Sequence, residues 1–170
     1  MKGVCYHLTV PLSPWAECDA VVQEANALQA RFGGMINHLY PSRRPGTRLP
    51  RYFWGIMHWP RLRWAERYIS LHHFYNPDPY PFAVLRLLRR PVIYTVSAGV
   101  QEGNQDNARR LAKYVQTVVV ATDAERERLL RWGIKNVARV RSGIDLTRFT
   151  SVPLPPELPP TILMLSLIHI

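Results

Sequence analysis

Cysteines, acidic residues and long apolar runs are scarce in this sequence, and each shortage excludes a class of protein. Cys5 and Cys18 are the only cysteines among 170 residues, too few for a disulfide framework or a cysteine-based zinc site. No apolar run approaches the roughly 20 residues that a membrane-spanning helix needs. The apolar residues before Val10 are interrupted by His7 and lack a small-residue cleavage site, which favours a buried strand over a signal peptide. We therefore expect a cytoplasmic protein.

Two common enzyme signatures are missing as well. Gly99 and Gly103 lack the third glycine and the spacing of a dinucleotide-binding loop. No serine or cysteine stands in a nucleophile motif. These absences argue against a nicotinamide-dependent dehydrogenase and against a hydrolase.

The shortage of acids leaves a strongly basic chain. There are 22 lysines and arginines against 12 acids, which gives a formal charge of +10. Such an excess attracts phosphate groups, so nucleic acid, anionic lipid and phosphorylated substrates are candidate partners, and a merely soluble basic surface is the alternative. The chain is 47% hydrophobic, which is enough to bury one core.

Basic and aromatic residues concentrate between positions 41 and 67, where only one acid, Glu66, occurs. The arginines are Arg43, Arg44, Arg48, Arg51, Arg61, Arg63 and Arg67, and the aromatic residues include Tyr52, Phe53, Trp54, Trp59 and Trp64. This mixture can pair phosphates and stack bases. Alternatively, the aromatic residues pack the domain beneath surface arginines, or the segment contacts anionic membrane lipid.

Strand and helix patterns alternate along the rest of the chain. Strands are predicted at 3–10, 35–40, 69–75, 92–96, 117–121 and 137–140, and helices at 14–32, 80–90, 107–114 and 126–132. Thr122 and Glu125 form a capping box before the last helix, and the wholly apolar 117–121 strand is expected to be buried on both faces. The alternation predicts a doubly wound, Rossmann-like α/β fold, with helices on both faces of a parallel sheet.

The C-terminal residues have a different composition. A proline-rich segment at 152–160 predicts a stiff linker after a domain spanning 1–151, and 161–164 begins another strand-like run. We interpret 161–164 as the first strand of a second domain. Residues 165–170 resemble the translated end of a transposon used to prepare sequencing libraries, with a natural apolar strand as the alternative.

A resemblance to a known family comes from the segment Val140–Phe149. Its Ser142-Gly143-Ile144-Asp145 turn and the following Phe149 resemble the end of the N-terminal domain in GT-B glycosyltransferases of family 4, where asparagine is usual at the serine position. The upstream segments 91–96 and 118–133 and the downstream segment 161–164 are similar to that family in the same order. On its own, the turn is more typical of an ordinary strand end with a glycine at positive φ, and the proline-rich segment and new strand that follow it favour the family.

The resemblance implies a function as well as a fold. Members transfer a sugar, usually with retention, from a nucleotide sugar to an acceptor hydroxyl in a cleft between two domains. The first domain presents a glycan, lipid or small-molecule acceptor, and the second holds the donor. We therefore expect the acceptor-side half of a hexosyltransferase, inactive by itself, with no cofactor or metal. A nucleic-acid-binding module without catalysis is the alternative, although we expect no nucleic-acid partner for the enzyme.

Candidate site residues follow the predicted strands, because ligands bind at the carboxyl ends of parallel strands. After the first strand, Trp15, Glu17 and Asp19 are candidate substrate contacts, although the two acids also suit the first turn of a helix. Relatives often carry a glycine pair here, where this chain has Pro14 and Trp15. The departure argues against close contact with a donor phosphate.

The other candidates follow later strands. Ser97 occupies the position of a family histidine that reaches the transferred sugar, and it is a catalytic candidate together with His73. His72 and Tyr75 are candidate substrate contacts, as are Ser142 and Gly143 in the family-like turn. Since side chains alternate along a strand, one of the paired histidines is expected to face the core and the other the cleft. Because of this opposition, and because no other ligand set has zinc-like spacing, we predict no metal site.

Overall fold

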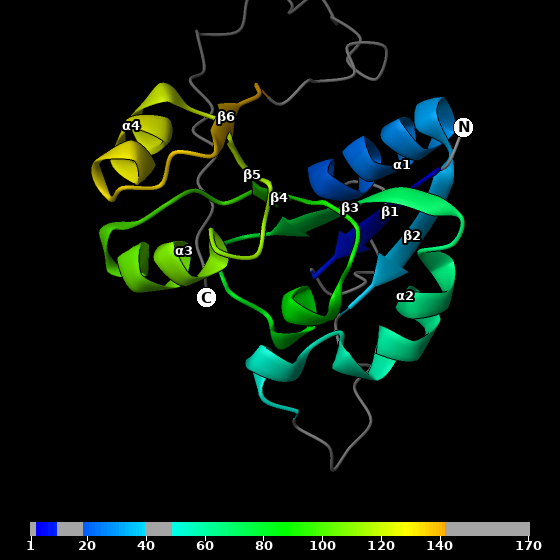
Figure 1. Cartoon of the computed structure of the whole chain (residues 1–170). Coiled ribbons are helices and arrows are strands. Elements are labelled where there is room, and N and C mark those ends of the chain that lie inside the picture. The colour runs from blue at the N-terminus through cyan, green and yellow to red at the C-terminus, as the bar shows by residue number, and fades with distance from the viewer. Residues whose placement is uncertain (1–2, 10–18, 40–48, 142–170) are drawn as a thin grey trace, which may run out of the picture.

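Six parallel strands form one sheet in the computed structural model, which describes residues 3–9, 19–39 and 49–141. The strand order is β2-β1-β3-β4-β5-β6 (Figure 1). The strands are β1 (Gly3–Leu8), β2 (Gly34–His38), β3 (Ile69–Asn76), β4 (Val92–Val96), β5 (Thr117–Val120) and β6 (Val137–Arg139). This arrangement confirms the predicted Rossmann-like α/β fold.

Helices cover both faces of this sheet, as the strand and helix alternation predicted. They are α1 (Ala20–Phe32), α2 (Trp59–Ala65), α3 (Gln105–Leu111) and α4 (Asp123–Arg131). Ala25 of α1 packs against Tyr6, Leu8 and Tyr75 on one face. The opposite face carries the larger core, where residues such as Phe74 and Tyr94 of the sheet join buried leucines of α2, α3 and α4. Figure 1 shows α1 on one side of the sheet and α2 and α3 on the other.

Local sequence explains where two of these helices begin and end. Asp19 caps α1 by accepting hydrogen bonds from the backbone N–H groups of Val21 and Val22, and Gly33 ends the helix at a φ of 69°. Thr122 and Glu125 form the predicted capping box at the start of α4. Both helices therefore depend on short-range hydrogen bonds that the sequence specifies.

Several predicted boundaries differ from the structure. Helix α1 begins at Ala20, after the Asp19 cap, and not at position 14. The predicted helix at 80–90 is a short 3₁₀ helix, η4 (Ala83–Leu87), flanked by Pro81 and Pro91. The basic and aromatic segment 41–67, for which no helix or strand was predicted, contains α2 and two further 3₁₀ turns, η2 (Arg51–Phe53) and η3 (Ile56–His58). Proline limits regular helix at both places because it cannot donate a backbone hydrogen bond.

The expectation that β5 is buried on both faces was wrong. Val118 and Val120 are buried, whereas Thr117 and Val119 on the other face are only partly covered. Helix α1 packs over β1 and β2, and it leaves the same face of β4 and β5 less covered. The sheet therefore has a partly open surface beside α1.

Candidate functional site

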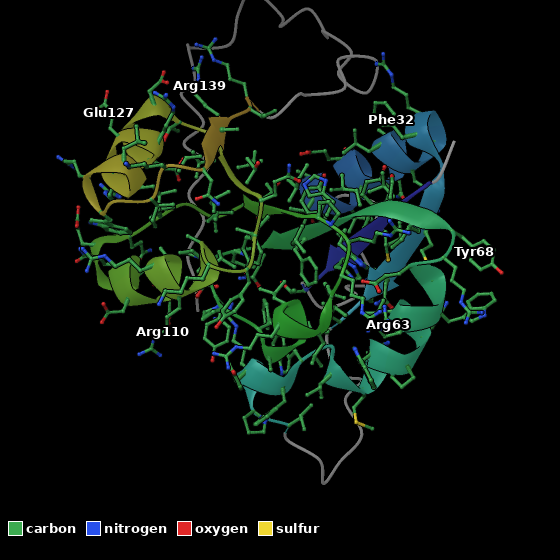
Figure 2. All side chains as sticks on the ribbon, in the orientation of Figure 1. Phe32, Arg63, Tyr68, Arg110, Glu127 and Arg139 are labelled. Carbon is green, nitrogen blue, oxygen red and sulfur yellow. The ribbon has the colours of Figure 1, made fainter. Side chains whose placement is uncertain are left out.

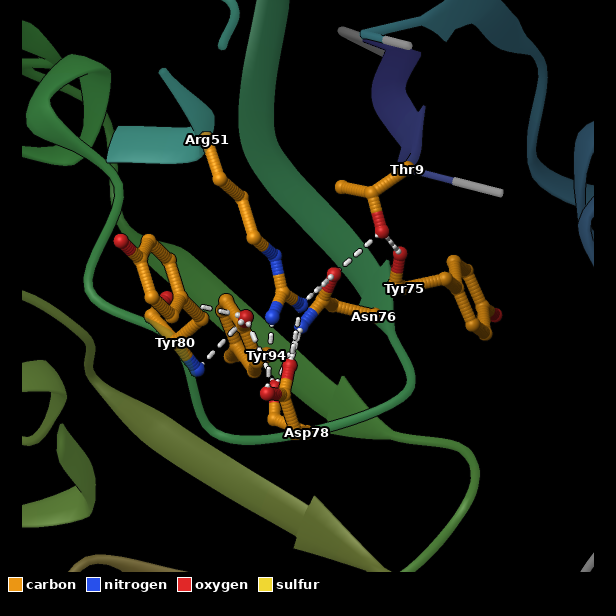
Figure 3. Close-up of polar contacts among 7 residues, drawn as sticks. All are labelled: Thr9, Arg51, Tyr75, Asn76, Asp78, Tyr80 and Tyr94. Atoms are coloured by element: carbon orange, nitrogen blue, oxygen red, sulfur yellow. Dashed lines mark hydrogen bonds and ion pairs between the residues drawn. The ribbon is translucent and has the colours of Figure 1, made fainter. Parts of the chain in front are cut away.

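The strand order reverses between β1 and β3, the point where open α/β sheets usually bind ligands. Thr9 follows β1, and its hydroxyl donates a hydrogen bond to the Tyr75 carbonyl at 3.1 Å and contacts the side-chain oxygen of Asn76 (Figure 3). Thr9 and Asn76 are both buried. The protein's own polar groups therefore join these two strand ends.

Arg51 of η2, outside the sheet, contacts the residues at the carboxyl end of β3. Its guanidinium pairs with both carboxylate oxygens of Asp78, one of them at 2.9 Å, and donates to the Asn76 side-chain oxygen at 3.3 Å (Figure 3). The Tyr80 ring lies 4.4 Å from the guanidinium carbon. Since its charge is matched by Asp78, Arg51 holds the loop after β3 in place, and its guanidinium is not free to bind an anionic ligand.

The buried Tyr94 supports the same loop after β3. The Tyr94 hydroxyl donates to the Tyr80 carbonyl at 3.0 Å and accepts from the Tyr80 backbone N–H at 3.2 Å. Burial raises the pKa of this phenol well above its usual value. Tyr94 therefore remains a neutral hydrogen-bonding support for the loop.

A pocket of about 330 Å³ lies beside these groups, between α1 and the partly open sheet surface. Strands β3, β4 and β5 supply its floor, and the start of α1 supplies one wall. Its polar lining residues are Glu24, His73, Tyr75, Thr95, Ser97 and Arg141, and apolar residues such as Leu28, Ile93 and Val119 lie between them. An apolar surface with a few converging polar groups is typical of small-molecule sites.

His73 is the most perturbed group in this pocket. Its Nε2 atom lies 2.8 Å from the Thr95 hydroxyl, and its ring stacks on Tyr75 with centroids 4.2 Å apart. Burial lowers the pKa of His73 to about 4. The imidazole is therefore neutral at neutral pH, so it can exchange hydrogen bonds with a hydroxyl but does not supply positive charge.

The remaining polar groups of the pocket come from separate elements. The Tyr75 hydroxyl donates to the Glu24 carboxylate at 3.1 Å, and the pKa of Tyr75 is raised mainly by burial and also by this acid. Ser97 is exposed, and its backbone N–H donates to the Asn76 carbonyl at 2.9 Å. The structure thus brings together three predicted residues, Ser97, His73 and Tyr75.

Sequence reasoning missed Glu24, Thr95 and Arg141 as pocket residues. Thr95 lies on β4, two positions before Ser97, which directly follows the strand, so the alternation of side chains could have found it. Glu24 lies on the second turn of α1, and only the packing of α1 on the sheet brings it to Tyr75. Arg141 follows β6 and directly precedes the family-like turn.

The other candidate residues have different outcomes. Asp19 caps α1, so the structure supports its alternative role at a helix start. His72 faces away from the pocket and is buried in the core layer, which confirms the predicted opposition of the two histidines. Trp15, Glu17, Ser142 and Gly143 lie outside the described residues, so their predicted roles stay predictions.

The structure corrects the reasoning against a metal site. Cys5, His7 and His72 are all buried, and one ligand atom from each lies within 4.8 Å of the others. Such a group could hold a metal ion. Sequence spacing concealed it because β1 and β3 are adjacent in the sheet but about 65 residues apart in the chain. The pattern Cys5-x-His7, which places two ligands on one face of a strand, was the available signal.

The basic and aromatic segment forms a surface around α2. A shallow pocket of about 540 Å³ is lined by Arg63, Trp64, Glu66, Arg67, Arg89 and Arg90. Trp64 and Tyr68 beside it are 59% and 60% exposed, and Tyr68 projects away from the domain (Figure 2). Trp54, by contrast, is only partly exposed and stacks on Phe82. The aromatic residues are therefore divided between packing and exposure.

Among the residues that the structure describes, no helix has the length and apolar character needed to cross a bilayer. Comparison with protein-family models, with curated proteins and with solved structures gives no match. The described residues therefore establish a Rossmann-like domain built on one parallel six-stranded sheet, with a mixed polar and apolar pocket beside α1.

Proposed function

We propose that the chain is the acceptor-side domain of a glycosyltransferase that moves a sugar from a nucleotide sugar to an acceptor hydroxyl. The observation that carries the proposal is the pocket over β3, β4 and β5, which extends to Ser97, Ala121 and Arg141 after the carboxyl ends of β4, β5 and β6. In a doubly wound domain this is the edge where ligands bind. The resemblance of the segment 140–149 to family 4 enzymes supports the same function.

The chemistry of the pocket suits an acceptor better than a donor diphosphate. His73 is neutral, and Glu24 brings a carboxylate that would repel phosphate. Neutral imidazole, hydroxyl and carboxylate groups can instead orient an acceptor hydroxyl by hydrogen bonds. Arg141 supplies the only positive charge among the residues lining the described pocket. On this proposal the groups that stabilise the departing diphosphate belong mainly to a second domain after the segment 152–160.

The test compares two proteins with a panel of nucleotide sugars and hydroxyl acceptors. We expect the 170-residue chain to show no transfer, and the same chain extended by the reading frame downstream of Met164 in the source DNA to transfer one sugar. Turnover by the 170-residue chain would contradict the proposal that the donor diphosphate is held mainly by a second domain. Failure of the extended protein with every donor would contradict the proposed function.

Variants of the extended protein test the pocket itself. Ser97→Ala and His73→Gln should each reduce kcat/KM for the acceptor by roughly tenfold, because each removes one hydrogen bond to the substrate. Ser70→Ala is the matched control, since Ser70 is exposed near the opposite end of β3. Equal reductions of kcat/KM in Ser70→Ala and Ser97→Ala would exclude a specific role for Ser97.

The arginine-lined surface supports a membrane partner for this enzyme. Arg67 and Arg89 are exposed around the pocket at α2, and Trp64 offers an exposed aromatic ring beside them. Arginine attracts anionic headgroups, and tryptophan favours the interface between water and lipid. Nucleic-acid binding is the competing function for the same surface, since phosphate and stacking groups also occur there.

A further inference from the structure

We propose that Cys5, His7 and His72 form a Zn²⁺ site in the core layer of the sheet, separate from the pocket beside α1. Cys5 and His7 lie two residues apart on one face of β1. His72 stands opposite Cys5 in the register of β1 with β3. Neighbouring strands are about 4.8 Å apart, so this register alone brings the three side chains together.

The distance between the two facing histidine nitrogens is close to that around a bound zinc ion. The Nε2 atom of His7 lies 2.9 Å from the Nδ1 atom of His72, and the ligand atoms of all three residues lie within 4.8 Å of one another. Zinc-nitrogen bonds of about 2.0–2.1 Å in a tetrahedral site require nitrogen atoms roughly 3.3 Å apart. Small rotations of the two rings would therefore admit the ion.

The outer nitrogen of each imidazole already has a partner. His72 Nε2 lies 3.3 Å from the Glu66 carboxylate, and this oxygen can only accept, so the proton is on Nε2 and the lone pair of Nδ1 points inward. A carboxylate that orients a histidine in this way is a common second partner of zinc ligands. His7 Nδ1 lies 3.4 Å from the Asn37 amide, which can present either its nitrogen or its oxygen.

The protonation states are also compatible with metal binding. Burial keeps the pKa values of His7 and His72 below the usual value, so both rings are neutral. Burial raises the pKa of Cys5 to about 12, so the thiol is protonated when no metal is bound. Binding would release the thiol proton to solvent and move the His7 proton from Nε2 to Nδ1, where the Asn37 oxygen accepts it. One proton is released for each ion, and no oxidant or reductant is needed.

The donor set selects the class of ion. Two imidazole nitrogens and one thiolate suit a borderline-soft cation, whereas Mg²⁺ and Ca²⁺ prefer oxygen ligands. The thiolate places one negative charge beside the dication, and the Glu66 carboxylate that faces His72 is itself paired with Arg63. Because the ligands connect β1 with β3, the ion would cross-link the centre of the sheet. This inference does not depend on the proposed transfer activity.

The experiment uses the purified 170-residue chain after treatment with a chelator. Added Zn²⁺ should bind with a stoichiometry of one ion per chain by equilibrium dialysis and elemental analysis. At a hundredfold excess over the dissociation constant, Tm should rise by roughly 5–10 °C. Co²⁺ in place of Zn²⁺ should give a sulfur-to-cobalt charge-transfer band. Failure to take up Zn²⁺ at micromolar concentration would overturn the proposal.

Matched variants separate this site from adventitious binding. Cys5→Ala and His72→Gln should each weaken Zn²⁺ binding at least tenfold, and Cys5→Ala should abolish the charge-transfer band. Cys18→Ser and His73→Gln are the controls, because each removes the same type of side chain and neither residue belongs to the proposed ligand set. Circular dichroism of the metal-free proteins establishes that each variant is folded, and any unfolded variant is replaced by His7→Gln. Unchanged binding in folded Cys5→Ala would overturn the proposal.

Discussion

At the residue scale, neighbouring side chains on one strand have different chemical environments. His72 contacts Cys5, His7 and Glu66 in the core layer, whereas His73 contacts Thr95 and Tyr75 beside α1. The alternation of side chains along β3 causes this difference and could be predicted from the sequence. The partners of each ring could not, since they come from other strands and from α2.

Acid should destabilise the protein through these histidines. His73 has a pKa of about 4 in the folded chain against 6.5 for the free group, and the pKa values of His7 and His72 are lowered as well. Between pH 6.5 and 4 the unfolded chain therefore binds more protons, so the free energy of unfolding falls as the pH falls. The His73 share is on the order of 3 kcal/mol, since each pKa unit corresponds to about 1.4 kcal/mol.

Urea unfolding followed by tryptophan fluorescence at several pH values measures this loss. His73→Gln should flatten the dependence between pH 6.5 and 4, because glutamine does not titrate. Burial alone would raise the pKa of the Glu66 carboxyl, but hydrogen bonds from the Arg89 backbone N–H and the Arg63 side chain lower it, so a further loss follows at more acidic pH when the carboxylate is protonated. An unchanged pH dependence in His73→Gln would contradict the assigned environment of this ring.

At the scale of elements, the turn between α1 and β2 shows how two glycines fix a crossover. Gly33 ends α1, and Gly34 begins β2 with a φ of 110°. A Cβ atom on Gly34 would lie 1.9 Å from the carbonyl oxygen of Val4 on β1. The sequence predicted a helix end here, but the close contact between strands is visible only in the folded chain.

Gly34→Ala should therefore destabilise the protein by about 2 kcal/mol or more, through backbone strain and steric conflict with β1. Gly103→Ala is the matched control, since a Cβ atom there would meet no atom within 4 Å and its φ is not positive. We expect that control to change stability by only about 0.5 kcal/mol. Chemical denaturation measures both variants, and equal losses would argue against the close approach of Gly34 to Val4.

Helix α2 illustrates the limit of prediction at this scale. Its seven residues include Pro60 and two exposed tryptophans, so no amphipathic period is visible in the sequence. Leu62 and Ala65 nevertheless pack into the core, which fixes the helix from one side. Packing with distant residues therefore determines this element, whereas the capping box of α4 was predictable because its hydrogen bonds join residues only three apart.

At the scale of the whole molecule, the charge of +10 and the arginine-lined surface predict binding to anionic membranes. The chain should bind vesicles of equal parts phosphatidylglycerol and phosphatidylcholine at low salt and dissociate as salt shortens the screening length. The double variant Arg67→Glu with Arg89→Glu should weaken binding roughly tenfold or more. Vesicle flotation over a range of salt concentrations provides the measurement.

A charge-matched control tests whether the surface or only the net charge matters. Arg110→Glu with Arg131→Glu makes the same change at exposed positions on α3 and α4. Equal weakening by both double variants would show that position is unimportant. Strong binding to random oligonucleotides without vesicle binding would favour the competing nucleic-acid function.

The sequence by itself determined the α/β class, most strand positions, the C-terminal end of α1 and the start of α4, because these depend on local periodicity, capping and glycine conformation. It also determined the basic charge and the opposition of His72 and His73. Only the tertiary structure decided which residues meet across strands. The parallel register places Cys5 beside His72, and the packing of α1 brings Glu24 to Tyr75. Parallel neighbours are joined by long crossovers, so contacts between them leave no regular spacing in the chain.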